Sequence, residues 1–267
     1  MIGVLGCGNM ASAIVKSVHQ FFPDIKFITY TPTQVRALQL AEDVNGQIVK
    51  DLTELNQCRI ILIGCKPQQF SELAQQLKDI IENKSIHFVS MMAAIDLETI
   101  ARKLGVQNVT RIMPNTPILY GQGVTLMIHH SSVTKDDRDY LEGLFKALGS
   151  LYLMDDELKF DQATTVTGSG PAYVFLFLKT LVDKLISWGI DEKSAKEMTI
   201  NMFLGSVHML NHSSEDISKL ISQVTSKGGI TIEAIRIYEE NKLDLISSVA
   251  LEAALNRSNE LTKEFSK

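Results

Sequence analysis

Several features that mark particular classes of protein are missing from this 267-residue chain. It has no cluster of Lys and Arg longer than a pair, and its net charge of −5 argues against a nucleic-acid surface. No apolar run approaches the length that spans a bilayer, and the stretch after Met1 lacks the basic and apolar regions of a signal peptide. These absences predict a soluble cytoplasmic protein whose partners are small molecules or other protein chains.

Cysteine is also scarce, and its pattern argues against two further roles. Cys7, Cys58 and Cys65 are an odd number and lack metal-ligand spacing, and they lie in or beside apolar runs. We therefore expect buried thiols in a reducing compartment. His208 and His212 are four residues apart, as two ligands on one helix face would be, but no third ligand stands near them. No metal site is predicted.

The chain begins with the pattern of a dinucleotide-binding turn. An apolar strand at residues 2–5 leads into Gly6-Cys7-Gly8-Asn9-Met10-Ala11, after which apolar residues recur with helical spacing. Gly6 permits the tight turn, Gly8 lets a pyrophosphate approach the backbone, and Ala11 stands in for the third glycine.

With 267 residues, of which 45% are hydrophobic, the chain is long enough for one large or two ordinary domains. Alternating strand and helix patterns continue to residue 154. This alternation predicts an α/β, doubly wound Rossmann domain over residues 1–156. Strands are expected at 26–30, 60–63, 86–89, 109–113, 123–128 and 151–154, with helices at 34–42, 70–81, 95–104 and 135–148.

The end of the second expected strand indicates which cofactor is held. A carboxylate there would bind the adenosine ribose of NAD, but Thr31 and Thr33 stand there instead, with Arg36 one turn on. Hydroxyls and an arginine suit a 2′-phosphate, which favours NADPH over NADH. The alternative, that Arg36 only solvates a helix face, stays open. Lys66 either faces the cofactor or is an ordinary surface lysine before Pro67.

Two prolines and two polar residues end a later strand, in Arg111-Ile112-Met113-Pro114-Asn115-Thr116-Pro117. Such a rigid segment suits the wall of a site, although a sharp loop would also use these prolines.

From residue 157 onward strand patterns disappear, which predicts an all-α domain over 157–267. The longest helix opens at Gly168-Ser169-Gly170-Pro171, and its residues 174–178 are apolar on every side, so they must be buried in a large core or between subunits. Later helices are expected at 192–210, 214–224, 230–240 and 243–263. A helical bundle of this kind predicts dimerisation.

A second glycine turn precedes the helix expected at 230–240, in Thr225-Ser226-Lys227-Gly228-Gly229-Ile230-Thr231. The two glycines allow successive N–H groups to converge on an anion at the positive end of that helix. Gly228 as a simple C-cap, with Ser226 or Thr231 as a simple helix cap, is the alternative.

Taken together, these motifs resemble the pyrroline-5-carboxylate reductase family, the NAD(P)H-dependent last enzymes of proline synthesis. The similarity covers essentially the whole chain and is carried by the glycine turn at 6–10, Lys66-Pro67-Gln68, and the segments 111–117, 168–173 and 225–234. It implies reduction of 1-pyrroline-5-carboxylate to L-proline by NADPH, with NADH as the second choice. It also implies a homodimer with active sites shared between subunits, which in this family assembles further into rings.

The resemblance also assigns site residues. Backbone and side-chain donors of Thr225, Ser226, Gly228, Gly229 and Ile230 hold the substrate carboxylate, and Thr231 is the catalytic residue that hydrogen-bonds the ring nitrogen. The residues expected at the cofactor are Gly6, Gly8, Asn9, Met10, Ala11, Thr31, Thr33, Arg36, Cys65, Lys66, Pro67 and Ala93.

Two departures from the family pattern lie in this second turn. Lys227 replaces the usual proline, and Ile230 replaces a small residue or threonine. They leave open a related cyclic imine as the substrate. A β-hydroxyacid dehydrogenase is disfavoured because Val174 occupies the place of its catalytic lysine. A non-catalytic NADPH-binding regulator of the same fold is the third alternative.

Overall fold

The computed structural model describes residues 1–81 and 85–265. Contacts divide them into two compact units. Unit 1 runs from Met1 to Pro171 and includes the chain from Ala254 onward, and unit 2 is Ala172–Ala253. The division at residue 156 and the roles given to the two domains from the sequence remain predictions.

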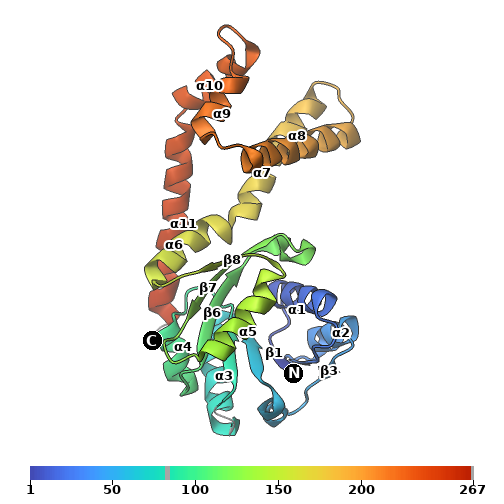
Figure 1. Ribbon diagram of the computed structural model, residues 1–267, viewed down its shortest axis with the longest axis vertical. Helices are drawn as coiled ribbons and strands as arrows, with labels where there is room; N and C mark the ends of the chain where they lie inside the picture. Colours follow the sequence, from blue (N-terminus) through green and yellow to red (C-terminus); the bar gives the residue numbers. More distant parts are fainter. Residues whose placement is uncertain (82–84, 266–267) are drawn as a thin grey trace. The chain divides into compact units, whose positions relative to one another are not determined.

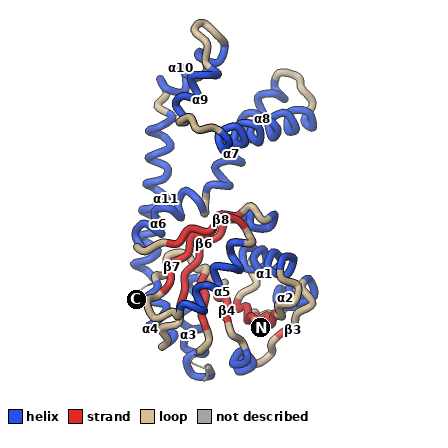
Figure 2. Tube along the Cα trace, viewed as in Figure 1, coloured by secondary structure: helices blue, strands red, loops and turns tan. Residues whose placement is uncertain are grey.

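An eight-stranded sheet forms the centre of unit 1 (Figures 1 and 2). Neighbouring strands are parallel except β6 and β7, which are antiparallel. The α/β class predicted from the sequence is confirmed, whereas the reversed strand and the two-residue β3 were not expected. In spatial order the strands are β3 (Gln47–Ile48), β2 (Phe27–Tyr30), β1 (Ile2–Leu5), β4 (Ile60–Ile63), β5 (His87–Ser90), β6 (Val109–Pro114), β7 (Gly123–His129) and β8 (Gly149–Leu153).

Strand β4 shows why the sheet is covered on both faces. Ile61 and Ile63 belong to one buried cluster, while Ile60 and Leu62 belong to the other. Because side chains alternate along a strand, a fully apolar strand needs an apolar layer on each side. β4 lies between β1 and β5, which confirms its predicted place inside the sheet.

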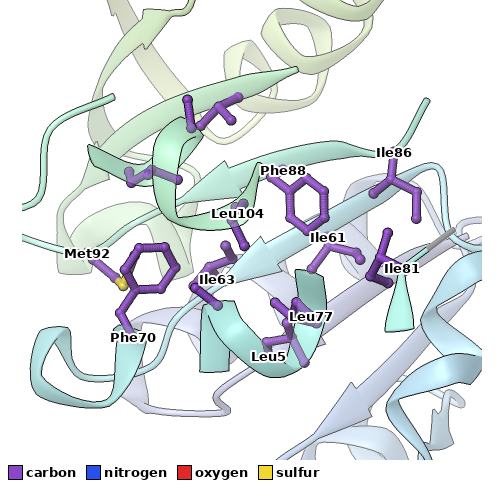
Figure 3. Close-up of a cluster of buried hydrophobic side chains, with 14 of the residues drawn as sticks. Leu5, Ile61, Ile63, Phe70, Leu77, Ile81, Ile86, Phe88, Met92 and Leu104 are labelled. Carbon is purple, nitrogen blue, oxygen red and sulfur yellow. The ribbon is translucent and has the colours of Figure 1, made fainter. Parts of the chain in front are cut away.

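Helices supply both layers. On one face α3 (Pro67–Ile80) and α4 (Leu97–Leu104) contribute Phe70, Leu77 and Leu104 to the cluster drawn in Figure 3. On the other face α1 (Asn9–Phe21), α2 (Val35–Asp43) and α5 (Lys135–Lys146) pack on the sheet. Unit 1 also contains the 3₁₀ turns η1 (Leu52–Gln57) and η2 (Thr116–Tyr120) and the helix α6 (Glu157–Thr167).

Side-chain caps fix where several of these helices start. Asp96, Thr134 and Asp156 stand just before α4, α5 and α6, and each accepts a hydrogen bond from the backbone N–H three residues on. Such a cap satisfies one of the free N–H groups of the first turn.

A buried polar row crosses the sheet on the face that α5 covers. His87 Nε2 lies 2.7 Å from Thr110 Oγ1, which lies 2.7 Å from His129 Nδ1. His129 Nε2 is 3.7 Å from Glu142 Oε1 on α5, too far for a good hydrogen bond. Because Nε2 of His129 faces the negative Glu142 carboxylate, the favoured tautomer carries its proton on Nε2. Nδ1 is then an acceptor, and the Thr110 hydroxyl donates to it. Both histidines are neutral in this arrangement.

Unit 2 is built from helices (Figure 2). Phe177 contacts the rings of Phe203 and Tyr238, with centroids 6.0 and 6.4 Å apart. Phe175 and Leu176, expected to be buried, are 63% and 65% exposed in the single chain. The helices are α7 (Gly170–Ser187), α8 (Glu192–His212), α9 (Ile217–Val224), α10 (Ile230–Glu240) and α11 (Leu243–Phe265), the last of which continues into unit 1.

Among the helices of the described residues, none is both long enough and apolar enough to cross a bilayer.

Candidate active site

A cavity of about 460 Å³ opens at the carboxyl ends of β1, β2 and β4. Ligands of doubly wound folds bind at this edge, where the strand order reverses between β1 and β4. Three segments line the cavity: the turn after β1, the turn after β2 with the first turn of α2, and one face of α3 with the turn before it. The lining residues are Leu5, Gly6, Cys7, Gly8, Tyr30, Thr31, Pro32, Thr33, Arg36, Gly64, Cys65, Lys66, Gln69, Glu72, Leu73 and Gln76.

The glycine turn forms the floor of this cavity. Gly6 has φ +88°, and a Cβ there would lie 2.6 Å from the backbone nitrogen of Cys65, so no side chain fits. A Cβ at Gly8 would meet nothing within 4 Å, which leaves open space above the turn. Gly8 caps α1 without a side-chain hydrogen bond, and the first turn of α1 holds no acidic residue. Its free N–H groups can therefore take an anion such as a pyrophosphate.

The turn after β2 and the first turn of α2 supply the groups suited to a 2′-phosphate. Thr31 is 9% exposed, and its hydroxyl has no hydrogen-bond partner among the described residues. Thr33 and Arg36 line the same cavity, and the Arg36 guanidinium has no ionic partner in the part of the chain that the structure describes. A buried hydroxyl without a partner is costly, so a ligand oxygen is expected to satisfy it.

The turn before α3 adds a positive charge and a thiol. Lys66 lines the cavity, which favours the cofactor-facing interpretation, and Pro67 opens α3. Cys65 is half-buried rather than buried, its Sγ lying 3.6 Å from Met92 Sδ. Burial raises the pKa of the Cys65 and Cys7 thiols to about 11. These thiols stay protonated at neutral pH and are not nucleophiles.

The structure brings seven of the twelve predicted cofactor residues to the cavity wall. Asn9 and Met10 begin α1, Pro67 begins α3, Ala11 is buried behind the turn, and Ala93 is exposed in the loop after β5. None of these five lines the cavity, and their contact with a cofactor stays a prediction. Sequence reasoning missed the face of α3 formed by Gln69, Glu72, Leu73 and Gln76. These residues are three, one and three positions apart, which is the spacing of one helix face, and this spacing could have indicated from the sequence that they share a surface.

The segment around Arg111 and Asn115 holds α6 and does not line the cavity. The Arg111 guanidinium is 1% exposed, bonds Glu157 and, at 3.0 Å, Asp161, and lies 4.4 Å over the Phe160 ring. Asn115 donates to the Thr167 carbonyl and accepts from the Val124 N–H. Arg111 of β6 and Asn115, the residue after β6, thus both hold α6, and the choice between a site wall and a sharp loop for this segment stays a prediction.

The second predicted anion site lies in unit 2, at the start of α10. Gly228 has φ +75°, and the N–H of Gly229 donates to the Ser226 carbonyl at 3.0 Å, which closes the turn. Gly229 caps α10 without a side-chain hydrogen bond. The hydroxyls of Ser226 and Thr231 have no partner in residues 1–81 and 85–265. The turn therefore presents free N–H and O–H donors, as a carboxylate requires.

Thr225 is used differently. Its hydroxyl donates to the Ile221 carbonyl at 3.0 Å, which makes it the C-terminal cap of α9. Ile230 is 93% exposed. The substrate contacts expected of these two residues stay predictions.

The two spaced histidines of α8 contact each other. Their rings are 4.1 Å apart, and His212 Nδ1 lies 2.9 Å from the His208 carbonyl. Within the described residues, no three His, Cys, Asp or Glu side chains are placed to hold a metal ion.

Comparison with known proteins decides the family. Over 269 aligned residues the chain is 30% identical to the pyrroline-5-carboxylate reductase of Vibrio alginolyticus, covering 99% of this chain and 98% of the relative. The chain belongs to the pyrroline-5-carboxylate reductase family. The resemblance predicted from the sequence is confirmed.

Family models and solved structures agree with this membership. A model described as pyrroline-5-carboxylate reductase dimerisation matches residues 157–261, and one described as NADP oxidoreductase coenzyme F420-dependent matches residues 1–94. The structure of the Plasmodium falciparum reductase with NADP bound shares 26% identity and a TM-score of 0.89, covering 98% of this chain and 97% of that one. The Streptococcus pyogenes reductase gives 27% identity and a TM-score of 0.86, covering 97% and 98%.

Proposed function

We propose that this chain reduces 1-pyrroline-5-carboxylate to L-proline with NADPH. One observation carries the proposal: two glycine turns, at Gly6–Gly8 and Gly228–Gly229, each precede an uncapped helix start, so the chain offers two anion sites with different surroundings. The first borders a cavity of about 460 Å³. The second is bounded by two hydroxyls and suits a small carboxylate. The full-length similarity to pyrroline-5-carboxylate reductases supports this assignment.

The cofactor site fits NADPH. The α1 start takes the pyrophosphate, and Thr31, Thr33 and Arg36 take the 2′-phosphate that distinguishes NADPH from NADH. The unpartnered Thr31 hydroxyl and the glycine floor, where a Cβ would collide, are the structural features that fit this group. When bound, NADPH supplies the hydride. NADH is the second cofactor that this site would accept, with lower affinity.

The chain's own task in the reaction is alignment. A protonated cyclic imine is already electrophilic at its C=N carbon, so no strong protein acid is needed. Ser226 and the N–H groups at the start of α10 hold the carboxylate, which fixes the carbon that faces the hydride donor. Thr231 orients the ring nitrogen or relays its proton.

We also propose a homodimer with shared active sites, and higher ring assembly, in the cytoplasm. The match of residues 157–261 to a dimerisation model supports the dimer. So do the exposed apolar side chains of α7, of which Phe175 and Leu176 are more than half exposed in the single chain. Exposed apolar surface of this extent is typical of a contact between subunits.

The direct test mixes the purified protein with 1-pyrroline-5-carboxylate and NADPH or NADH and follows nicotinamide absorbance. We expect imine-dependent oxidation, faster with NADPH. Cofactor binding without imine-dependent oxidation would contradict the reductase and favour a non-catalytic regulator. Oxidation only with another cyclic imine would reassign the substrate.

Thr231→Ala tests the catalytic assignment. Removing a positioned hydroxyl should lower kcat on the order of 10²-fold and leave the Kd of NADPH unchanged, because unit 1 supplies the cofactor cavity. Ser222→Ala is the control, since the Ser222 hydroxyl only bonds the Lys219 carbonyl within α9. Wild-type kcat in Thr231→Ala would remove Thr231 from the mechanism.

A further inference from the structure

The turn before α10 contains a charged side chain to which the mechanism above gives no role. Gly228 has φ +75°, Lys227 is not among the residues with positive φ, and the Gly229 N–H donates to the Ser226 carbonyl. These are the features of a type II β-turn with Lys227 at its second position. Proline suits that position because its ring fixes φ, so the lysine leaves the turn less restricted. What lysine adds to the turn is a positive charge.

The donors proposed to hold the substrate carboxylate lie next to this charge. A Cβ on Gly229 would collide with Ser226 Oγ, so the Ser226 hydroxyl lies beside the uncapped N–H groups at the start of α10. Lys227 directly follows Ser226 in the chain. Its long, flexible stem allows the ammonium group to reach an anion held by these donors.

Pairing of the neighbouring charges leaves Lys227 as the uncompensated cation of this segment. Residues 225–236 hold three charged side chains, which are Lys227, Glu233 and Arg236. Arg236 Nη2 lies 3.2 Å from Glu233 Oε2, and Arg236 Nη1 lies 2.6 Å from Glu240 Oε1. Lys227 has no ionic partner within the residues that the structure describes. Exposed lysines without a partner are common, but this one belongs to the carboxylate turn itself.

We propose that the Lys227 ammonium group forms an ion pair with the carboxylate of 1-pyrroline-5-carboxylate and that Lys227 thereby sets the affinity for the substrate. The inference rests on the proposed function. Ser226 and the N–H groups are neutral donors, and the dipole of α10 supplies only a partial positive charge, to which Lys227 adds a full one. Because the carboxylate does not react, the ion pair stabilises the bound substrate and the transition state equally. It therefore lowers KM and leaves kcat unchanged.

Lys227→Met tests the ion pair, because it keeps an unbranched side chain and removes the charge. Initial rates are measured on the purified full chain at saturating NADPH. We expect KM for 1-pyrroline-5-carboxylate to rise about threefold to fivefold, as for the loss of one partly screened ion pair, with kcat and the Kd of NADPH unchanged. Raising NaCl from about 20 to about 300 mM should raise KM in the wild type and in Lys227→Arg, and much less in Lys227→Met.

Two further variants serve as controls. Lys193→Met removes the same charge at an exposed position in the first turn of α8 and should keep the wild-type KM and its salt dependence. Lys227→Pro fits the second position of the turn and should lose the salt dependence as Lys227→Met does, which separates the charge from the conformation of the turn.

Three outcomes would overturn the inference: a wild-type KM in Lys227→Met, an unchanged salt dependence in that variant, or an equal rise of KM in Lys193→Met. The last of these would show that overall charge sets the affinity. If the wild-type protein does not reduce 1-pyrroline-5-carboxylate at all, the proposed function itself fails.

Discussion

Acidification should destabilise unit 1 through the two histidines buried under α5. Burial lowers the pKa of His87 to about 4, an effect that the nearby Asp137 opposes and His129 and Arg59 reinforce. Burial likewise lowers the pKa of His129 to about 4, with Arg138 reinforcing the shift and Glu142 opposing it. Both rings are therefore neutral in the folded protein at neutral pH, with Thr110 between them.

The magnitude follows from linkage. In the unfolded chain both histidines take up protons below their ordinary pKa of 6.5, while in the folded chain they do so only near 4. Their contribution to stability is therefore complete above pH 6.5 and is lost as the pH falls from 6.5 to 4. Each pKa unit is worth about 1.4 kcal/mol, so the full loss is about 3 kcal/mol for each histidine. Between about pH 7.5 and about pH 5.5 the loss is about 1.4 kcal/mol each.

Urea unfolding at these two pH values measures the effect. The matched variant is His87→Gln with His129→Asn, in which an amide nitrogen replaces the donor Nε2 of His87 and an amide oxygen replaces the acceptor Nδ1 of His129, and neither amide titrates. The difference in free energy of unfolding between the two pH values should be smaller in this variant by about 2–3 kcal/mol. His212→Asn, at an exposed site in unit 2, should retain the wild-type difference. Equal pH dependence of the double variant and the wild type would refute the reasoning.

Two further substitutions test the buried ion pairs of Arg111 and the glycine turn at the cofactor cavity. Arg111→Met leaves Glu157 and Asp161 beside a buried apolar side chain and should lower the free energy of unfolding by about 3 kcal/mol, read as a drop in Tm. Arg257→Met, in an exposed pair with Glu260, should change it little, and equal drops would contradict the buried-pair argument. Gly6→Ala should weaken NADPH binding at least about tenfold in a fluorescence titration, because it combines a left-handed φ with a backbone collision. Gly143→Ala, in open space on α5, should bind NADPH normally and be more stable by about 0.5–1 kcal/mol, and normal binding by both variants would show that the Gly6 turn tolerates a Cβ.

Much of the fold could be predicted because its signals are local. The glycine turn after β1, the alternation of buried strands and amphipathic helices, and the limits of α10 at Ile230 and Glu240 all follow from spacing and turn chemistry. The direction of β7 could not be predicted, because alternation is the same for parallel and antiparallel strands. Strand β3 has only two residues, too few for any periodicity to show.

The sequence predicted the glycine turns and several side chains that line the cavity, such as Thr31, Arg36 and Lys66, but it missed the face of α3. Gly6 and Gly228 need positive φ, which their sequence contexts indicate directly. Glu72 and Gln76 look like ordinary solvent-facing residues of a helix, and only the position of α3 beside the turn after β2 gives them a cavity to face. Asn115 belongs to a segment for which the sequence allows a site wall or a sharp loop, and both ends of its amide are used inside unit 1.

The contact between the two turns at the base of the cavity restricts how this protein can evolve. A Cβ on Gly6 would lie 2.7 Å from the Gly64 carbonyl oxygen, and a Cβ on Gly64 would lie 2.9 Å from the Gly6 carbonyl oxygen. Each residue is crowded by the backbone of the other, and both are already glycine, the smallest residue. A substitution at one position therefore cannot be compensated by a change of side chain at the other. Because these two glycines touch, the turns after β1 and β4 can move only together, so a mutation that displaces one turn should displace the other as well.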